Sequence, residues 1–386
     1  MDLVELRARS TAVLYTVSSA LSGVTLTSSM PAAAIYSHAT THSLGALVCR
    51  GLELAGCAPD NAVLDKLKSA RREMVFSAAR NSILARFDEH KIKYICLKGI
   101  VFKSLYPELG LREMTDNDIL IDPNSRAEVR RIMRSLGYTV ESYGKSHHDI
   151  YTKEPFLNFE MHITLFSVKN ERFHKYFEAV FEKAARVDDE TYECRMSDED
   201  FYIYTKAHEY KHYISGGIGM RTLVDTYVYL KDKGDALDFD YITEECDKIG
   251  IAEYESLSRA LAMKIFDTGF LPSLLIAAKG GELSLDQDEI EMLDYFASSG
   301  TFGKVSRQVE NEIRRYEADG GGRTSKIKFL LRNVFPPISF YRESAPIVYK
   351  VKILIPFYCI GRLIVTLLKR PARVFAKIKS TVKYKK

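Results

Sequence analysis

The sequence predicts a helix-rich α+β protein, because helical periodicity on both sides encloses one segment of short strands. Residues 1–90 and the chain from Asp198 onward carry apolar residues at helical spacing. Between them, short apolar runs bounded by glycine and turn residues indicate a mixed sheet flanked by helices. The chain has 386 residues, of which 46% are hydrophobic, so it can form several domains with substantial cores.

These periodicities divide the chain into four expected parts. We expect a helical N-terminal region over 1–90, an α+β unit over 91–197, a helical domain over 198–317 and a tail over 318–386. The best linker candidate is ADGGGR at 318–323, because clustered glycines favour loops over regular structure.

In the N-terminal region the clearest helix begins near Asn61, which can serve as its N-cap. Its apolar residues recur at helical spacing and predict one packed face: Val63, Leu64, Leu67, Ala70, Met74, Ala78 and Ile83. The periodicity then changes. KYICLKG at 93–99 predicts a short strand that ends in glycine, and MTDNDILID at 114–122 predicts a second strand.

The next helix has clear start and stop signals. Asp122 can cap it, Pro123 occupies its first position, and Gly137 ends it. Val129, Ile132, Met133 and Leu136 form its apolar face. Further strands are expected around turns at 138–144 and 149–155 and at 156–166, with the His147-His148-Asp149 segment as a loop.

The carboxylates are the strongest chemical signal in the strand-rich segment. Asp116 and Asp118 are two residues apart in a predicted strand, so both side chains point to the same face. Two adjacent carboxylates repel each other and are best tolerated with a cation between them, and oxygen ligands select Mg²⁺ or Mn²⁺. Glu160 lies on a later predicted strand, where it either faces the same site or is exposed. His162, two residues further on, should share its strand face and is also a candidate site residue.

Upstream of these acids, Gly99 separates a strand from a short helix. Glycine there permits close approach of the backbone, and the N–H groups at a helix start favour phosphate. Lys98 and Arg112 can add positive charge toward a triphosphate.

Together these segments resemble a known family. LKG at 97–99, LREMTDNDILI at 111–121, NFEMHI at 158–163 and RTLVDTYVYL at 221–230 are similar to the bacterial "uncharacterised nucleotidyltransferase" family, within the DNA polymerase β-type nucleotidyltransferase superfamily. The resemblance covers roughly residues 60–365. It implies a polymerase β-like catalytic unit over 91–197, with helical regions on both sides.

The resemblance also implies residue roles. Asp116, Asp118 and Glu160 would be the metal-binding triad for two Mg²⁺ (or Mn²⁺) ions, and Gly99 the glycine on the phosphate side. The enzyme would move an NMP from an NTP to an acceptor hydroxyl on a small molecule, surface-glycan precursor, peptide or RNA. Many superfamily members have Ser after a Gly pair where this chain has Lys98-Gly99-Ile100, so we expect Lys98 to take over part of the triphosphate grip.

HEYKH at 208–212 matches the HExxH pattern of zinc peptidases, in which two histidines bind Zn²⁺ and the glutamate is the general base. A recognisable third ligand is missing, since Ser215 and Ile218 occupy the Gly and His positions of the extended motif. The alternative is that His208, His212, Arg221 and Asp225 line the nucleotide or acceptor cleft, or are polar groups between helices.

The charge distribution predicts a polyanionic partner. Residues 323–386 contain 16 Lys/Arg and one acid, for a net charge of +15, and the other 322 residues then carry −11. Ile353, Phe357, Ile360, Leu363, Ile364 and Leu367 give the stretch 351–368 an apolar side. We expect a basic amphipathic helix on an anionic membrane surface, or docked on the protein body; nucleic acid is less favoured because aliphatic residues separate the charges.

The remaining composition bears on location. The six cysteines are scattered without a CxxC pair, which fits a reducing compartment. The N-terminus carries Asp2 and Glu5 and has no continuous apolar run, so we expect no signal peptide. We therefore expect a cytoplasmic protein, attached at the inner face of the membrane by its tail. A non-catalytic membrane scaffold that keeps the fold is a further alternative.

Overall fold

A computed structural model describes residues 2–25, 27, 30–301, 309, 311, 313, 331–336, 338, 340–341, 345–369 and 371–383. Contacts between Cα atoms divide the chain into two compact units. The first contains Met1–Glu209 with Gly219–Thr301, and the second contains Tyr210–Ile218 with Phe302–Lys386. The predicted part boundary at 317/318 lies outside the described residues, and those at 90/91 and 197/198 stay predictions.

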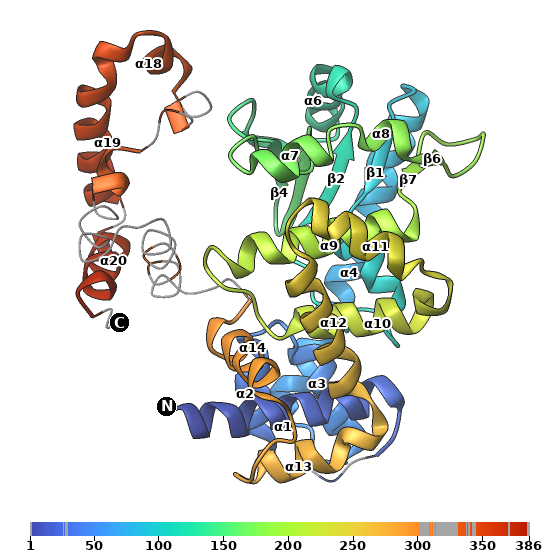
Figure 1. The fold of residues 1–386 in the computed structure, drawn as a ribbon. Helices are drawn as coiled ribbons and strands as arrows, with labels where there is room; N and C mark the ends of the chain where they lie inside the picture. The colour runs from blue at the N-terminus through green and yellow to red at the C-terminus, as the bar shows by residue number, and fades with distance from the viewer. Residues whose placement is uncertain are drawn as a thin grey trace. The chain divides into compact units, whose positions relative to one another are not determined.

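The first unit begins with four helices and continues into strands and short helices (Figure 1). Its elements up to the sheet's end are α1 (Leu3–Ser22), α2 (Ala32–Thr40), α3 (Gly45–Leu54), α4 (Asp60–Glu89), β1 (Tyr94–Cys96), α5 (Gly99–Phe102), η1 (Lys103–Leu105), β2 (Asn117–Ile121), η2 (Pro123–Ser125), α6 (Arg126–Ser135), β3 (Thr139–Ser142), β4 (His148–Lys153) and β5 (Leu157–His162).

The chain then returns to helices, as the periodicity from Asp198 predicts. These elements are α7 (Glu171–Tyr176), α8 (Val180–Lys183), β6 (Ala185–Arg186), β7 (Cys194–Arg195), α9 (Asp198–Tyr213), α10 (Arg221–Lys233), η3 (Gly234–Ala236), α11 (Phe239–Lys248), α12 (Ala252–Phe266), η4 (Thr268–Phe270), α13 (Leu271–Ala278) and α14 (Gln287–Ser299). Helix α1 packs against α2, α3, α13 and α14, so the first and last helices of this unit form one cluster.

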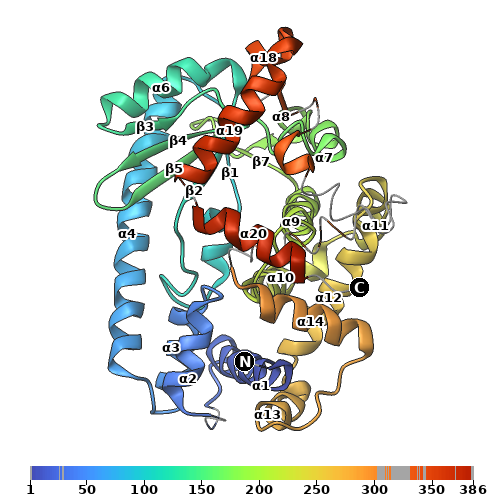
Figure 2. The same cartoon turned by 90° about the vertical axis from the view of Figure 1, so that its left-hand side faces the viewer.

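The central sheet has five strands in the order β1-β2-β5-β4-β3 and is mixed. β2 pairs with β5 in parallel, whereas the pairs β1–β2, β5–β4 and β4–β3 are antiparallel. Helices α4 and α6 lie along the sheet (Figure 2), and their apolar residues meet one of its faces. The helix-rich α+β class and the mixed sheet flanked by helices are therefore confirmed.

The core fixes which face of the sheet is buried against α4 and α6. Ile119 of β2 and Phe159 and Met161 of β5 belong to this core. Because side chains alternate along a strand, Asp118 and Glu160 point to the opposite face. The same alternation that buries the apolar residues on one face of the sheet thus places the two acidic side chains on the other face.

The structure corrects the predicted apolar face of α4. Leu64, Leu67 and Met74 are exposed, at 56%, 58% and 61%, although their spacing is helical. Ile83 of the predicted face is buried, and the other buried residues of the helix are Ala62, Glu73, Phe76, Arg80 and Phe87. The helix also begins at Asp60 after Pro59, not at a capped Asn61. This 30-residue helix carries two overlapping rows of apolar residues, and the row that contains the phenylalanines packs against the sheet.

Two other local predictions need correction. Asp122 accepts a hydrogen bond from the Asn124 N–H at 3.0 Å, but it caps the short η2 turn, and α6 starts only at Arg126. His148 and Asp149 lie in β4 and not in a loop, and only His147 precedes the strand. The expected stop holds, since Gly137 has the positive φ of 82° that a side chain disfavours.

The described part of the second unit contains α18 (Pro346–Lys350), η7 (Lys352–Leu354), α19 (Ile355–Lys369) and α20 (Pro371–Lys383). The apolar residues expected on one side of 351–368 are all exposed, Ile353 at 76% and Phe357 at 72%. Among the described residues no single helix is long and apolar enough to cross a membrane; one bent pair, Ala252–Phe266 with Thr268–Ala278, passes that test only when taken together.

Candidate active site

Asp118 and Glu160 lie side by side because β2 and β5 are parallel neighbours. The register pairs Asp118 directly with Glu160. His162, one step further along the same strand face, approaches both carboxylates: its Nε2 lies 2.7 Å from Asp118 Oδ1 and 3.7 Å from Glu160 Oε2. Ligand atoms of the three side chains all lie within 4.8 Å of one another, which is close enough to share one metal ion.

Lys98 is the cation of this group. Its Nζ donates to Asp118 Oδ1 at 2.8 Å, from a backbone with a positive φ of 44° that is unusual for a side-chain-bearing residue. Burial alone would lower the pKa of Lys98, but Asp118 raises it well above its ordinary value. Burial likewise opposes ionisation of Asp118, yet Lys98 and His162 hold its pKa below the usual range. Asp118 is therefore an ionised carboxylate in a buried position.

Asp116 differs from its neighbour. It precedes the first residue of β2, so the prediction that both aspartates lie in the strand holds only for Asp118. It is not a member of the group within 4.8 Å. Burial and the charge of Asp118 raise its pKa, against the opposing charges of Lys98, Arg221 and Arg112. A second cation near Asp116 would relieve this repulsion.

Gly99 lies directly against the side chain of Arg112. A Cβ at Gly99 would lie 2.5 Å from Arg112 Nη1 and 3.2 Å from Met114 Cε, so a larger residue would displace Arg112. The space beside Gly99, which we predicted for a phosphate, is thus occupied by the guanidinium of Arg112. Gly99 starts α5, which is only four residues long.

Arg112 and Asp225, both predicted to bind nucleotide, bind each other. Arg112 Nε and Nη2 donate to the two oxygens of Asp225 at 2.8 Å each, and the Tyr106 hydroxyl donates to Oδ1 at 2.8 Å. The side chains are only 8% and 10% exposed. Burial alone would lower the pKa of Arg112, but Asp225 raises it above its ordinary value. This cluster joins α10 to the segment that carries Asp116 and Asp118.

Arg221 lies at the start of α10 and donates from Nη1 to the Glu113 carbonyl at 3.1 Å. Burial and the neighbouring Arg112 lower its pKa, and Asp225 partly compensates. Of the predicted nucleotide-binding cations, Lys98 and Arg221 therefore act electrostatically on Asp116, and Arg112 adds to them while bound to Asp225.

The HEYKH segment lies in α9, with His212 in its last turn. Glu209 is buried and accepts from Lys206 Nζ at 3.0 Å; the same ammonium donates to Thr226 Oγ1 at 2.6 Å. A glutamate held in this way is a structural ion-pair partner, not a base for metal-bound water. No group of three metal-ligand side chains found in the described residues includes His208 or His212.

Two residues near the carboxylates escaped the sequence analysis. His148 Nε2 lies 3.7 Å from Glu160 Oε2. The only feature of the sequence that could have indicated His148 is its position next to a second histidine, His147. Tyr204 of α9 is fully buried; burial raises the pKa of its hydroxyl, the charge of Lys98 lowers it, and those of Asp118 and Glu160 raise it further. The spacing of tyrosines in α9 predicts packing, and only the tertiary structure shows that Tyr204 borders the site.

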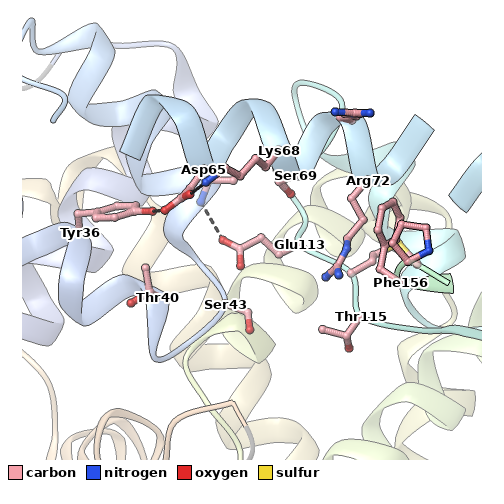
Figure 3. Close-up of a pocket in the computed structure, with 14 residues that line it drawn as sticks. Tyr36, Thr40, Ser43, Asp65, Lys68, Ser69, Arg72, Glu113, Thr115 and Phe156 are labelled. Carbon is pink, nitrogen blue, oxygen red and sulfur yellow. Dashed lines mark hydrogen bonds and ion pairs between the residues drawn. The ribbon is translucent and has the colours of Figure 1, made fainter. Parts of the chain in front are cut away.

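A cavity of about 650 Å³ adjoins the segment that carries the aspartates (Figure 3). Thr115, the residue before Asp116, borders it, as do residues of α2, α4 and the β4–β5 turn. Arg72 lies with its Cζ 4.9 Å from the ring centroid of Phe156. Asp65 on the wall accepts hydrogen bonds from Tyr36 and Lys68 at 2.8 Å each.

Comparison with family models supplies an independent observation. The model described as "Uncharacterised nucleotidyltransferase" matches residues 28–267. The chain belongs to this nucleotidyltransferase family. The match contains every predicted site residue, from Lys98 to Asp225, and ends before the basic tail. Comparisons with curated proteins and with solved structures gave no match.

We expect Asp225→Asn to be destabilising, because Arg112 would be left as a buried charge without its carboxylate. Removing one partner of a buried ion pair lowers the free energy of unfolding by about 3–5 kcal/mol. The measurement is urea unfolding followed by circular dichroism. Asp232→Asn is the matched control, since Asp232 is on the same helix with its side chain 50% exposed. Equal stability of the two variants would contradict a structural role for Asp225.

Proposed function

We propose that this protein transfers an NMP from an NTP to a hydroxyl group of an acceptor and releases pyrophosphate. The observation that carries the proposal is the direct pairing of Asp118 with Glu160 across β2 and β5, with Asp116 two residues upstream. The family assignment supports nucleotidyl transfer in general. In the transfer, the acceptor oxygen bonds to the α-phosphorus, the bond to the pyrophosphate oxygen breaks, and the hydroxyl proton passes to Glu160.

The donor set fits Mg²⁺ or Mn²⁺, because carboxylate oxygens of Asp118 and Glu160 lie within 4.8 Å of one another and Asp116 adds a third carboxylate two residues before Asp118. Asp116, Asp118 and Glu160 would hold two ions. When bound, these ions supply positive charge that stabilises the negative charge developing on the phosphoryl oxygens. Lys98 and His162 keep Asp118 ionised and oriented, and Lys98 and Arg221 add positive charge for the triphosphate.

The first test is calorimetric titration of non-hydrolysable analogues of ATP, GTP, CTP and UTP, with and without Mg²⁺. We expect one analogue to bind in a Mg²⁺-dependent way. Asp116→Asn/Asp118→Asn should weaken that binding at least about 100-fold, because it removes two charged ligands. Asp122→Asn is the control, since Asp122 belongs to the same segment but caps η2.

Two results would count against the transferase. Failure of folded wild-type protein to bind any analogue would favour the non-catalytic scaffold. Unchanged affinity of Asp116→Asn/Asp118→Asn for the analogue would show that the nucleotide does not bind at these aspartates.

We propose that the cavity beside Thr115 receives the acceptor and not the NTP. Its lining is nearly balanced in charge, with Lys68, Arg71 and Arg72 against Asp65 and Glu113, and a triphosphate would meet both carboxylates. Hydroxyl side chains of Tyr36, Thr40, Ser43 and Ser69 also line it, which suits an acceptor with hydroxyl groups. Figure 3 shows these side chains around the cavity.

Arg72→Ala should accordingly leave the affinity for the NTP analogue unchanged in the same titration. Arg72 contacts Phe156 at the cavity, whereas the charges that act on Asp116 come from Lys98, Arg112 and Arg221. A large loss of NTP affinity in Arg72→Ala would instead place the donor in the cavity.

We further propose that the basic tail attaches this cytoplasmic protein to the anionic inner face of a membrane. Helix α19 exposes Phe357, Ile360 and Ile364 at 72%, 56% and 52%, within a segment rich in Lys and Arg. Exposed aliphatic and aromatic side chains between basic residues are typical of helices that lie in the membrane interface.

Vesicle flotation tests this attachment. Full-length protein should float with vesicles of phosphatidylcholine and phosphatidylserine, and less with phosphatidylcholine alone. Phe357→Ser/Ile364→Ser should abolish flotation, because apolar area supplies much of the affinity. Leu64→Ser/Leu67→Ser removes two similarly exposed apolar residues from α4 and should float as wild type. Tail-dependent binding to RNA without any flotation would contradict the membrane proposal.

A further inference from the structure

Three histidines gather beside the carboxylates. Ligand atoms of His147, His148 and His162 all lie within 4.8 Å of one another. Their ring centroids are 4.6 Å apart for His147–His148, 5.1 Å for His148–His162 and 5.6 Å for His147–His162. Three imidazoles at these distances form a candidate ligand set, and His147 and His148 are not members of the triad Asp116, Asp118 and Glu160.

The backbone builds this arrangement from two strands. His148 of β4 pairs with His162 of β5 in the antiparallel register, so both side chains project from the same sheet face. The His147 carbonyl accepts the Ile163 N–H at 2.8 Å, which fixes the residue before β4 against the end of β5. The cluster therefore depends on sheet hydrogen bonds and is preorganised.

The loop that precedes His147 is also anchored. Asp149 accepts hydrogen bonds from Arg126 Nε and Nη2 at 2.7 and 2.6 Å, and from the Gly144 N–H at 2.8 Å. Asp149 is 1% exposed, so this anchor is buried. Ser146 Oγ lies 3.1 Å from His147 Nδ1 and can fix which nitrogen of that ring faces outward.

Glu160 lies beside two of these histidines. Its Oε2 lies 3.7 Å from Nε2 of both His148 and His162. Three imidazole nitrogens and one carboxylate favour Zn²⁺ and related divalent transition metals, whereas Mg²⁺ prefers oxygen ligands and keeps its water. We propose that His147, His148 and His162, with Glu160, bind a divalent transition-metal ion of the Zn²⁺ class. This site goes beyond the proposed transferase and does not depend on it.

The alternative is that the rings only pack edge to face, with no affinity for metal. A Co²⁺ titration distinguishes the two, because Co²⁺ enters Zn²⁺ sites and absorbs visible light according to its ligands. The protein is the full chain, purified without a histidine tag and treated with chelator. Calorimetry with Zn²⁺ on the same protein gives affinity and stoichiometry.

We expect one Co²⁺ per chain, with visible absorption, and displacement by Zn²⁺. His147→Ala/His148→Ala should lower the affinity at least about 100-fold, since loss even of residues that only support a ligand weakens metal binding 10–100-fold. His208→Ala/His212→Ala removes two histidines from HEYKH and should bind as wild type. X-ray absorption of the Zn²⁺-loaded wild type should show scattering from about three imidazoles, and this measurement needs no variant to fold.

Three outcomes would overturn the proposal: no Co²⁺ or Zn²⁺ binding by folded wild type, unchanged binding in His147→Ala/His148→Ala, or loss of binding only in His208→Ala/His212→Ala. NTP titrations of the same preparations separate this result from the transferase. Loss of nucleotide binding in Asp116→Asn with retained Co²⁺ binding would show that the histidine site binds its ion without the nucleotide site being intact.

Discussion

The parallel pairing of β2 with β5 is the constraint on which the rest of the site depends. It places Asp118 directly beside Glu160 on a face whose opposite side is packed against α4 and α6. The buried carboxylate of Asp118 and the half-buried one of Glu160 repel each other, and Lys98 and His162, which both contact Asp118 Oδ1, offset part of this repulsion. The sheet therefore creates an excess of negative charge that its own cations only partly neutralise, and divalent cations fit such a position.

A second buried ion pair connects this sheet to the helices that follow it. Arg112 stands four residues before Asp116 and binds Asp225 of α10 through two hydrogen bonds. Gly99 leaves the space that the guanidinium occupies. Arg112 and Asp225, both predicted from the sequence to bind nucleotide, thus hold the 112–118 segment in place. Their contribution to a reaction would come through the position of the aspartates and not through direct contact alone.

Alternation and composition were sufficient to predict the fold class, since this follows from local periodicity. Whether Glu160 faces Asp118 stayed open, because it depends on the pairing of β2 with β5. They were insufficient wherever a partner distant in sequence decides the outcome. The spacing in α4 supported an apolar stripe through Leu64 and Leu67, but the sheet packs against Phe76 instead. Lys206 pairs with Glu209 one turn away in α9, but its ammonium is held by Thr226 of α10 and Ser258 of α12, and no spacing within HEYKH contains that information.

The two proposed ligand groups share Glu160, and His162 of one contacts Asp118 of the other, so an ion in one must affect the other. In this structure His162 Nε2 serves Asp118 at 2.7 Å. A transition-metal ion that takes Nε2 would release Asp118 Oδ1 from its imidazole and leave Lys98 as its partner. An ion that takes Nδ1 would preserve that contact and make Nε2–H a stronger donor to Asp118. In both cases the effect is reciprocal. If the ion at the histidines changes the affinity of the carboxylates for their cation by some factor, that cation changes the affinity of the histidines for their ion by the same factor.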